Sequence, residues 1–282
     1  MKKALALLLS AVFMLSVFAG CTSNNSSSST TSIQPMQQLR VGMECAYAPF
    51  NWTQTDRSNG AVPISNDATG YANGYDVQMA KKIADNLGME LVIVAIQWDG
   101  LITALNSGTI DLVVAGMSPT DERKQSIDFT DYYYKSDLVI VVKKDGPYAG
   151  AKALADFSGA KITGQQGTTH YDVIDQIPGV KKQVAGTDFP AMIVSLKSGI
   201  IDGYVSERPG ALSAVSANPD LTFVGFAEGK GFTYDVNQSY VAIGVKKGSD
   251  LLDKVNGALA SISDDTRSQL MNEAIVNSAA LD

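Results

Sequence analysis

The sequence has few of the residues that most often carry catalysis or bind transition metals. Its 282 residues include one histidine and two cysteines. Zinc sites built from several Cys or His ligands are therefore poorly supported, and we expect no metal and no cofactor. We find neither an adjacent acid–base pair nor a nucleophile–base motif, so we expect no catalytic residues and do not expect an enzyme.

Clusters of basic residues are also missing. The formal net charge is -7, and it becomes -9 when Lys2 and Lys3 are removed with a leader segment. Proteins that bind nucleic acids usually present a basic patch or stripe. We therefore expect no nucleic acid partner.

The N-terminus has the pattern of a secretory leader. Lys2 and Lys3 precede an apolar run at residues 4–18, which is shorter than the roughly 20 residues of a spanning helix. The run ends at the small residues Ala19 and Gly20, and polar sequence follows Cys21. This pattern predicts a signal peptide over residues 1–20 and export from the cytoplasm.

The four residues that end at Cys21 resemble a bacterial lipobox, although Phe18 stands where leucine is usual. The resemblance implies that Cys21 is lipidated and anchors the protein to the outer face of the cell membrane. Ordinary cleavage that leaves Cys21 as a free thiol is the alternative. Residues 22–32 are almost all Ser, Thr and Asn, which predicts a disordered tether over residues 21–38. With Cys21 acylated, Cys45 has no partner for a disulfide.

About 240 residues follow the tether, enough for one large or two small domains. One predicted helix presents apolar residues at helical spacing: Val77, Ala80, Ile83, Ala84 and Leu87. Residues 91–95 then read as a buried strand. A second helix at 101–105, a stop at Ser107-Gly108 and a buried strand at 110–115 repeat the pattern. This alternation predicts an α/β fold with parallel strands.

An internal repeat predicts two similar lobes. Residues 101–114 match residues 192–205 at seven of fourteen positions without a gap, and both contain an SG turn and an Ile-Asp strand start. In open α/β sheets, ligands lie beyond the carboxyl ends of the strands. Residues 116–118 and 206–208 should therefore face one ligand site in a cleft between the lobes.

Two β-rich runs, Leu138 to Lys144 and Ser239 to Lys247, bracket the second repeat and indicate where the chain crosses between lobes. We therefore expect the first lobe to comprise residues 39–142 and 242–282, with closing helices at 251–262 and 266–276. The second lobe is the insert at 143–241.

Arg123 stands near a predicted helix start. Ser118 would be the N-cap, Pro119 the first helical residue and Asp121 the acid at the third position. The free N–H groups of such a helix end, together with a guanidinium, suit a carboxylate. The alternative is that Arg123 is a solvated helix residue.

Four segments resemble the family 3 solute-binding proteins, the polar amino acid receptors of ABC importers. They are AGMSPTDERKQSIDFTDYYYKS at 115–136, YAPF at 47–50, GYDV at 74–77 and WDGLITALNSGTIDLVVAG at 98–116. The resemblance spans Leu39 to the C-terminus. It implies a two-lobed periplasmic-binding-protein-like fold of type II, with two Rossmann-like lobes joined by two hinge strands. It further implies a monomer whose partners are a free amino acid and the permease subunits of an importer.

Carried over residue by residue, the resemblance places the ligand's α-carboxylate on Arg123, with Ser118 and Gly116 at the same end. From the second lobe, the QQGTTH segment places Thr168 against the carboxylate. The α-ammonium partner falls on Glu207, which also follows the strand of the second repeat. An ion pair between Glu207 and its neighbour Arg208 is the alternative.

Side-chain specificity is expected from Glu44, Tyr47 and Trp98, which match family positions around the ligand side chain, and from Gln165. Aromatic faces attract cations, and an acid at Glu44 favours a donor-rich side chain. We therefore rank arginine first, then lysine or histidine, with glutamine close behind. Tyr47 and Trp98 could equally be core residues.

Other interpretations stay open at this point. A dehydratase-like enzyme of the same fold could use Glu44 or Glu207, and a surface sensing or adhesion protein could share the clamp. We expect the single histidine, His170, to be a loop or helix-start residue and not a ligand contact. Residues 53–71 are predicted to form a surface hairpin near the cleft.

Overall fold

The computed structural model describes residues 36–235 and 240–279. The predicted signal peptide, Cys21 and most of the tether lie outside these residues. Within the described residues, no helix combines the length and the apolar character that crossing a membrane requires.

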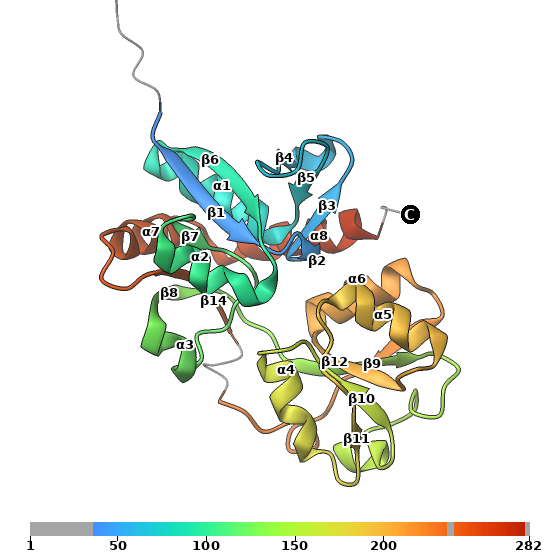
Figure 1. Cartoon of the computed structure of the whole chain (residues 1–282). Helices are drawn as coiled ribbons and strands as arrows, with labels where there is room; N and C mark the ends of the chain where they lie inside the picture. Colours follow the sequence, from blue (N-terminus) through green and yellow to red (C-terminus); the bar gives the residue numbers. More distant parts are fainter. Residues whose placement is uncertain (1–35, 236–239, 280–282) are drawn as a thin grey trace, which may run out of the picture. The chain divides into compact units, whose positions relative to one another are not determined.

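The first lobe is built on a five-stranded sheet in the order β6-β1-β7-β14-β8 (Figure 1). Its strands are β1 (Gln38–Met43), β6 (Glu90–Ala95), β7 (Leu112–Val113), β8 (Ile127–Tyr134) and β14 (Val241–Lys246). Strand β1 pairs in parallel with β6 and β7, whereas β14 pairs antiparallel with β7 and β8. The sheet is therefore mixed, and its parallel part is the predicted one.

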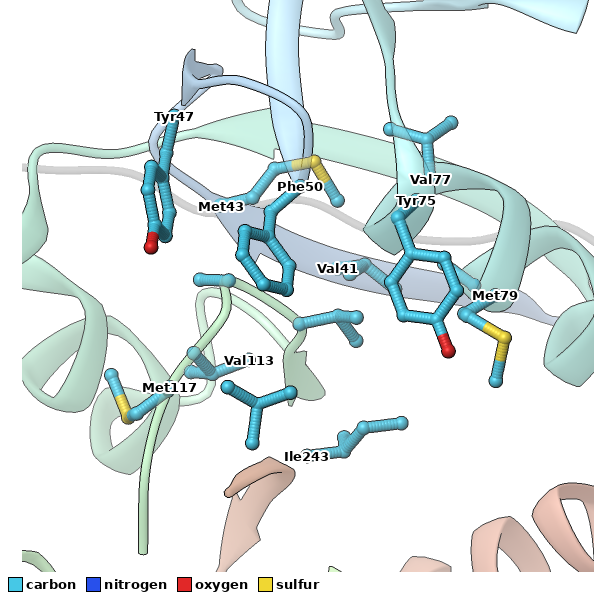
Figure 2. Close-up of a cluster of buried hydrophobic side chains, with 14 of the residues drawn as sticks. Val41, Met43, Tyr47, Phe50, Tyr75, Val77, Met79, Val113, Met117 and Ile243 are labelled. Atoms are coloured by element: carbon cyan, nitrogen blue, oxygen red, sulfur yellow. The ribbon is translucent and has the colours of Figure 1, made fainter. Parts of the chain in front are cut away.

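The helices of the first lobe are α1 (Tyr75–Leu87), α2 (Leu101–Ser107), α3 (Asp121–Ser126), α7 (Leu251–Ala260) and α8 (Asp264–Ser278), with the short 3-10 turn η2 (Trp98–Gly100) before α2. Helix α1 forms where apolar spacing predicts it, and its face with Val77, Ala80 and Ile83 is fully buried. Figure 2 shows Tyr75 and Met79 of α1 gathered with Val41 and Ile243 in the core of the first lobe.

A small four-stranded sheet, in the order β2-β3-β5-β4, accompanies the first lobe. It consists of β2 (Ala46–Tyr47), β3 (Asn51–Gln54), β4 (Val62–Pro63) and β5 (Tyr71–Asn73), with the 3-10 turn η1 (Ser58–Gly60) between β3 and β4. Residues 53–71 thus belong to a sheet of their own, which joins the larger sheet through a bridge between Ile64 and Ile93.

The second lobe is built on a sheet in the order β11-β10-β12-β9-β13. Its elements are β9 (Leu138–Lys143), β10 (Lys161–Thr163), β11 (Lys181–Lys182), β12 (Gly203–Glu207), β13 (Leu221–Val224), α4 (Thr169–Asp172), α5 (Phe189–Ser198), α6 (Arg208–Ala217), η3 (Leu154–Phe157) and η4 (Val173–Gln176). Strand β12 pairs in parallel with β10 and antiparallel with β9. The fold is therefore the predicted α/β fold with two lobes, and its sheets are mixed where parallel strands were predicted.

The repeat folds in the same way in both lobes. Helix α2 ends at Gly108 (φ 77°) and leads to β7, and helix α5 ends at Gly199 (φ 79°) and leads to β12. A left-handed residue after a helix is most often glycine, because a side chain there is strained. The shared SG turn therefore has the physical role that the sequence predicts.

Two predicted details are wrong. Residues 138–142 were expected in the first lobe, but β9 pairs with β12 and β13 of the second sheet, so the crossing lies before Leu138. The predicted buried strand at 91–95 is β6, an edge strand in which only Ile93 is fully buried. Its outer side is covered only around Ile93, where Ile64 bridges to it, and its burial is correspondingly incomplete.

Candidate functional site

The carboxyl ends of β7 and β12 meet at a small cavity, as expected for an α/β fold. Eleven residues line it: Tyr47, Trp98, Gly116, Ser118, Arg123, Leu138, Gln165, Thr168, Thr169, His170 and Glu207. Eight of the nine predicted ligand residues are among them. The ninth, Glu44, contacts Gln165 directly. The structure therefore brings the whole predicted set together from both lobes.

The cavity has a volume of about 20 Å³. A cavity of roughly 10–15 Å³ holds a single water molecule. An amino acid is several times larger, so side chains must move or the lobes must separate before one can enter.

Arg123 reaches across the cleft. Its Nη1 donates to the Ser118 carbonyl and its Nη2 to the Gly167 carbonyl of the second lobe, both at 2.8 Å. The guanidinium also lies 4.9 Å from the centre of the Trp98 ring, in cation–π geometry. Burial lowers the pKa of Arg123 to about 10, so it stays charged at neutral pH. Arg123 is thus a cleft residue, and the solvated alternative is wrong.

The predicted cap of this helix is wrong. Helix α3 begins at Asp121, and Thr120 is its N-cap, with a side-chain oxygen that accepts from the Arg123 N–H at 3.3 Å. Ser118 lies before the helix and contributes its carbonyl to Arg123 instead. The carboxylate partner offered by this region is therefore the Arg123 guanidinium.

Three buried polar atoms of cavity-lining residues have no hydrogen-bond partner among the described residues: Tyr47 Oη, His170 Nδ1 and Glu207 Oε2. Glu207 is 2% exposed and ends β12 directly before α6. Its Oε1 lies 3.6 Å from His170 Nε2. Buried polar groups normally have partners, because an unsatisfied one is costly. These atoms therefore suit a ligand that donates several hydrogen bonds.

Arg208 does not pair with Glu207. Its guanidinium makes a two-pronged contact with Asp137, at 2.8 Å and 2.6 Å. The alternative of a Glu207–Arg208 ion pair is therefore wrong, and Glu207 faces the cavity.

Tyr47 combines a core position with a place in the site. Its ring stacks on Phe189 of the second lobe at 4.2 Å and on Phe50 at 4.9 Å. Burial and the negative charge of Glu207 raise the pKa of Tyr47 well above its usual range, so the hydroxyl stays protonated. Trp98 is partly buried, packs against the core and also contacts Arg123, so it too combines the two roles.

Glu44 and Gln165 form a second contact across the cleft. Gln165 Nε2 donates to Glu44 Oε1 at 2.8 Å and to the Thr187 carbonyl at 3.2 Å. The pKa of Glu44 is raised to about 7. Burial is the main cause, and the charges of Asp188 and Asp99 add to it, whereas the hydrogen bond from Gln165 acts in the opposite direction. This corner of the site therefore concentrates negative potential, which a cationic group would relieve.

Thr168 and Gly116 belong to two of the loops that line the cavity. Thr168 caps α4 and donates from its hydroxyl to the Gln165 carbonyl at 2.7 Å. Gly116 has a φ of 59°, and an added Cβ would lie 2.9 Å from a ring carbon of Tyr47. A larger residue at Gly116 would therefore be strained and would press on the Tyr47 ring.

Three lining residues, Leu138, Thr169 and His170, are not predicted from the sequence. The expectation that His170 lies at a helix start is met, since it is the second residue of α4, and the structure places it in the lining of the cavity as well. Its place two residues after Thr168 was the available signal. Within the described residues, no group of His, Cys, Asp or Glu side chains is arranged to hold a metal ion.

The chain is similar to several known proteins. The family model for bacterial extracellular solute-binding proteins, family 3, matches residues 39–276. The arginine-binding extracellular protein ArtP of Bacillus subtilis is 30% identical over 267 residues, with 94% of each chain covered. A probable histidine-binding protein of Campylobacter jejuni is 32% identical over 223 residues, covering 77% of this chain and 78% of its own.

A solved structure is also similar. It is an amino acid ABC transporter substrate-binding protein from Streptococcus pneumoniae bound to L-arginine. It is 27% identical with a TM-score of 0.73, and the match covers 85% of this chain and 94% of that one.

Proposed function

Because the chain belongs to the bacterial extracellular solute-binding proteins of family 3, we propose that it is the substrate-binding receptor of an ABC importer for a free polar L-amino acid. Arginine is the preferred ligand, followed by lysine or histidine, with glutamine close behind. The observation that carries the proposal is the pairing of unlike charges in the lining of one cavity. The Arg123 guanidinium and the carboxylate of Glu207, which has an unpartnered oxygen, both line it.

The α-carboxylate of the ligand takes the place of the carbonyls that Arg123 now contacts. Arg123 holds two neutral acceptors at 2.8 Å. A carboxylate accepts both prongs of a guanidinium, and charge-assisted hydrogen bonds are about twice as strong as neutral ones. This exchange favours the ligand over the contacts that it displaces.

The preference for arginine rests on the corner around Glu44. Asp99 and Asp188 add negative charge near a carboxylate that is already largely buried. A guanidinium would pair with Glu44 in place of Gln165 and remove the mutual repulsion. The arginine-binding relatives support the same ranking. A neutral amide such as that of glutamine could still hydrogen-bond to Glu44 but would leave its charge uncompensated.

Ligand binding works by closure of the two lobes. In the described structure the lobes touch through Arg123 and Gly167, through Glu44 and Gln165, and through the rings of Tyr47 and Phe189. The cavity inside is too small for an amino acid, so entry requires opening. The ligand then bridges both lobes and stabilises the closed state through contacts that the open state lacks.

The predicted leader and Cys21 complete the proposal. Cys21 is the lipid anchor, and residues 22–38 are the tether that lets the two lobes reach the importer from the outer face of the membrane. Mass spectrometry of the membrane-bound protein would find a diacylated N-terminal cysteine. A free thiol at residue 21 would contradict the anchor while leaving the receptor function intact.

The test of the function is a binding screen with free amino acids on residues 36–282. A ligand at 100 times its Kd raises the free energy of unfolding by about 2.7 kcal/mol, which a thermal-shift assay detects. Arginine should give the largest shift, and calorimetry should then give its Kd. No shift with any amino acid would contradict the proposal, and conversion of an added amino acid to a product would indicate the dehydratase-like alternative.

Arg123→Ala should abolish binding of every amino acid, because it removes the common carboxylate partner. Arg57→Ala is the matched control, since Arg57 is exposed and stacks on Tyr71 outside the cavity. Calorimetry checks both variants after thermal unfolding without ligand has established that each is folded. Retained arginine binding by Arg123→Ala would remove this residue from the site.

A further inference from the structure

The single histidine of the chain lies inside the candidate site. His170 is buried, and its ring meets Phe189 edge-on at 5.9 Å and 83°. Its Nε2 is 3.6 Å from Glu207 Oε1, beyond hydrogen-bond distance but close enough for a direct charge interaction. The imidazole is therefore held in place beside the carboxylate that the proposed function assigns to the ligand's ammonium.

The unpartnered atoms around this ring match the hydrogen-bonding needs of an ammonium group. Tyr47 Oη, His170 Nδ1 and Glu207 Oε2 lack partners among the described residues, and all three belong to residues that line the cavity. A primary ammonium has three N–H donors and no acceptor. A carboxylate oxygen, a phenol oxygen and a neutral imidazole nitrogen are three acceptors.

We propose that His170, in its neutral form, is a ligand-binding residue that together with Glu207 and Tyr47 binds the α-ammonium of the ligand, so that protonation of His170 releases the ligand. The inference rests on the proposed amino acid ligand. It adds a residue and a proton dependence that the function itself does not require.

The sign of the effect follows from charge. A protonated His170 places a positive charge 3.6 Å from Glu207 and pairs with it. It also has no free lone pair, so it cannot accept a hydrogen bond from the ammonium. Proton and ligand therefore compete for the same carboxylate, and by linkage each weakens the binding of the other.

Other charged and titratable groups lie near the His170 ring, and their effects on the pH dependence must be distinguished from that of His170. Those that line the cavity or lie near its ammonium end are Glu207 from β12, Tyr47 from β2, Arg123 from α3, Asp172 from α4 itself and Tyr134 from β8. Tyr47 and Tyr134 have pKa values raised by burial, and Arg123 stays charged, so these three do not change charge between pH 5 and 8. Burial raises the pKa values of both Glu44 and Asp76 to about 7. Glu44→Gln removes the first contribution, and Asp76, whose charge also acts on Tyr47 and Glu207, is present in every variant that is compared.

The chain offers a direct measurement, because its single histidine gives one set of imidazole NMR signals. These signals are followed from pH 8 to pH 5 in Glu44→Gln protein without ligand, with L-arginine, and with the arginine analogue that lacks the α-amino group. L-Arginine should move the midpoint of the ring titration to lower pH by at least about one pH unit. The analogue should leave the midpoint unchanged, because it has no ammonium to compete with.

Calorimetry over the same pH range gives the reciprocal result. The Kd for L-arginine should rise by about tenfold for each pH unit below the midpoint of the free protein. His170→Asn combined with Glu44→Gln should lose the part of this pH dependence that comes from His170, because asparagine does not titrate, whereas the contribution of Asp76 is the same in both proteins. His170→Gln provides a second non-titrating variant if His170→Asn fails to fold.

The outcomes separate this inference from the proposed function. If L-arginine and the other free amino acids fail to bind at pH 8, the proposed function fails. If an amino acid binds but the imidazole midpoint stays in place and the Kd has the same pH dependence with and without His170, only the role of His170 is refuted.

Discussion

Asp76 joins the two loops that carry the site, and its substitution should change stability in a pH-dependent way. The carboxylate is fully buried in the first turn of α1. It accepts from Tyr133 Oη at 2.6 Å and from Asn51 Nδ2 at 2.8 Å. Through these partners it reaches the Cys45 N–H and the Gly116 N–H, which Asn51 Oδ1 and Tyr133 Oη accept. One carboxylate therefore fixes the chain after both β1 and β7.

Burial is the main cause that raises the pKa of Asp76 from 3.8 to about 7, against its hydrogen bonds. Between these two pH values the unfolded chain has released the proton and the folded chain still holds it. The free energy of unfolding therefore falls as pH rises from about 4 to about 7 and is constant above that. At about 1.36 kcal/mol per pKa unit, the loss is on the order of 4 kcal/mol.

Asp76→Asn removes this ionisation. At pH 4 the variant should be less stable than the parent by about 1 to 2 kcal/mol, because an amide cannot accept both hydrogen bonds. At pH 8 that deficit should shrink or reverse, because only the parent has been destabilised. Urea unfolding at intervals from pH 4 to pH 8 measures the difference, in which the titrations of other groups cancel.

The control is Asp85→Asn on the exposed side of the same helix, which should change stability by less than about 0.5 kcal/mol at pH 8. A stability difference between Asp76→Asn and the parent that stays the same from pH 4 to pH 8 would refute the reasoning. It would mean that the buried carboxylate is already ionised at low pH.

Two further predictions concern the ligand. Glu44→Gln should weaken arginine binding by tenfold or more, because it removes the negative charge that faces the ligand side chain, and should change glutamine binding by less than about threefold. Competition calorimetry measures the ratio of the two affinities, and an unchanged ratio would contradict this role of Glu44. Gly116→Ala should lower the free energy of unfolding by about 1 to 2 kcal/mol, because the φ of 59° is strained for alanine and the added Cβ presses on Tyr47. It should weaken the binding of every amino acid to a similar extent. Urea unfolding and calorimetry check it, and full stability with parent-like affinity would show that the loop tolerates a side chain.

The parts of the fold that depend on local sequence are those that the sequence predicts well. Helix α1 and the turns at Gly108 and Gly199 follow from apolar spacing and from the left-handed backbone that glycine permits. The repeat predicts both site loops, because the carboxyl ends of the strands point the same way in each lobe. The boundary at residue 142 fails, since an apolar strand such as β9 carries no sign of which sheet it will join.

Long-range contacts explain what the sequence does not predict in the site. Asp137 pairs with Arg208, 71 positions away, and this frees Glu207 for the cavity. His170 approaches Glu207 only because α4 packs beside the end of β12. The N-cap of α3 is difficult to predict from sequence, because Ser118 and Thr120 are both suitable N-cap residues. The path of the backbone selects Thr120.

The α-carboxylate and the α-ammonium of the ligand should contribute differently to affinity. At the carboxylate end, a ligand replaces the contacts of Arg123 with Ser118 and Gly167, so it gains only the difference between charged and neutral acceptors. In the proposed binding mode, the ammonium meets Glu207 Oε2 and His170 Nδ1, which have no hydrogen-bond partner among the described residues, so the ligand displaces fewer contacts there. A ligand can shift the lobes only by its differential contacts with the closed and open states. In this binding mode we therefore expect the ammonium to contribute more to closure than the carboxylate does.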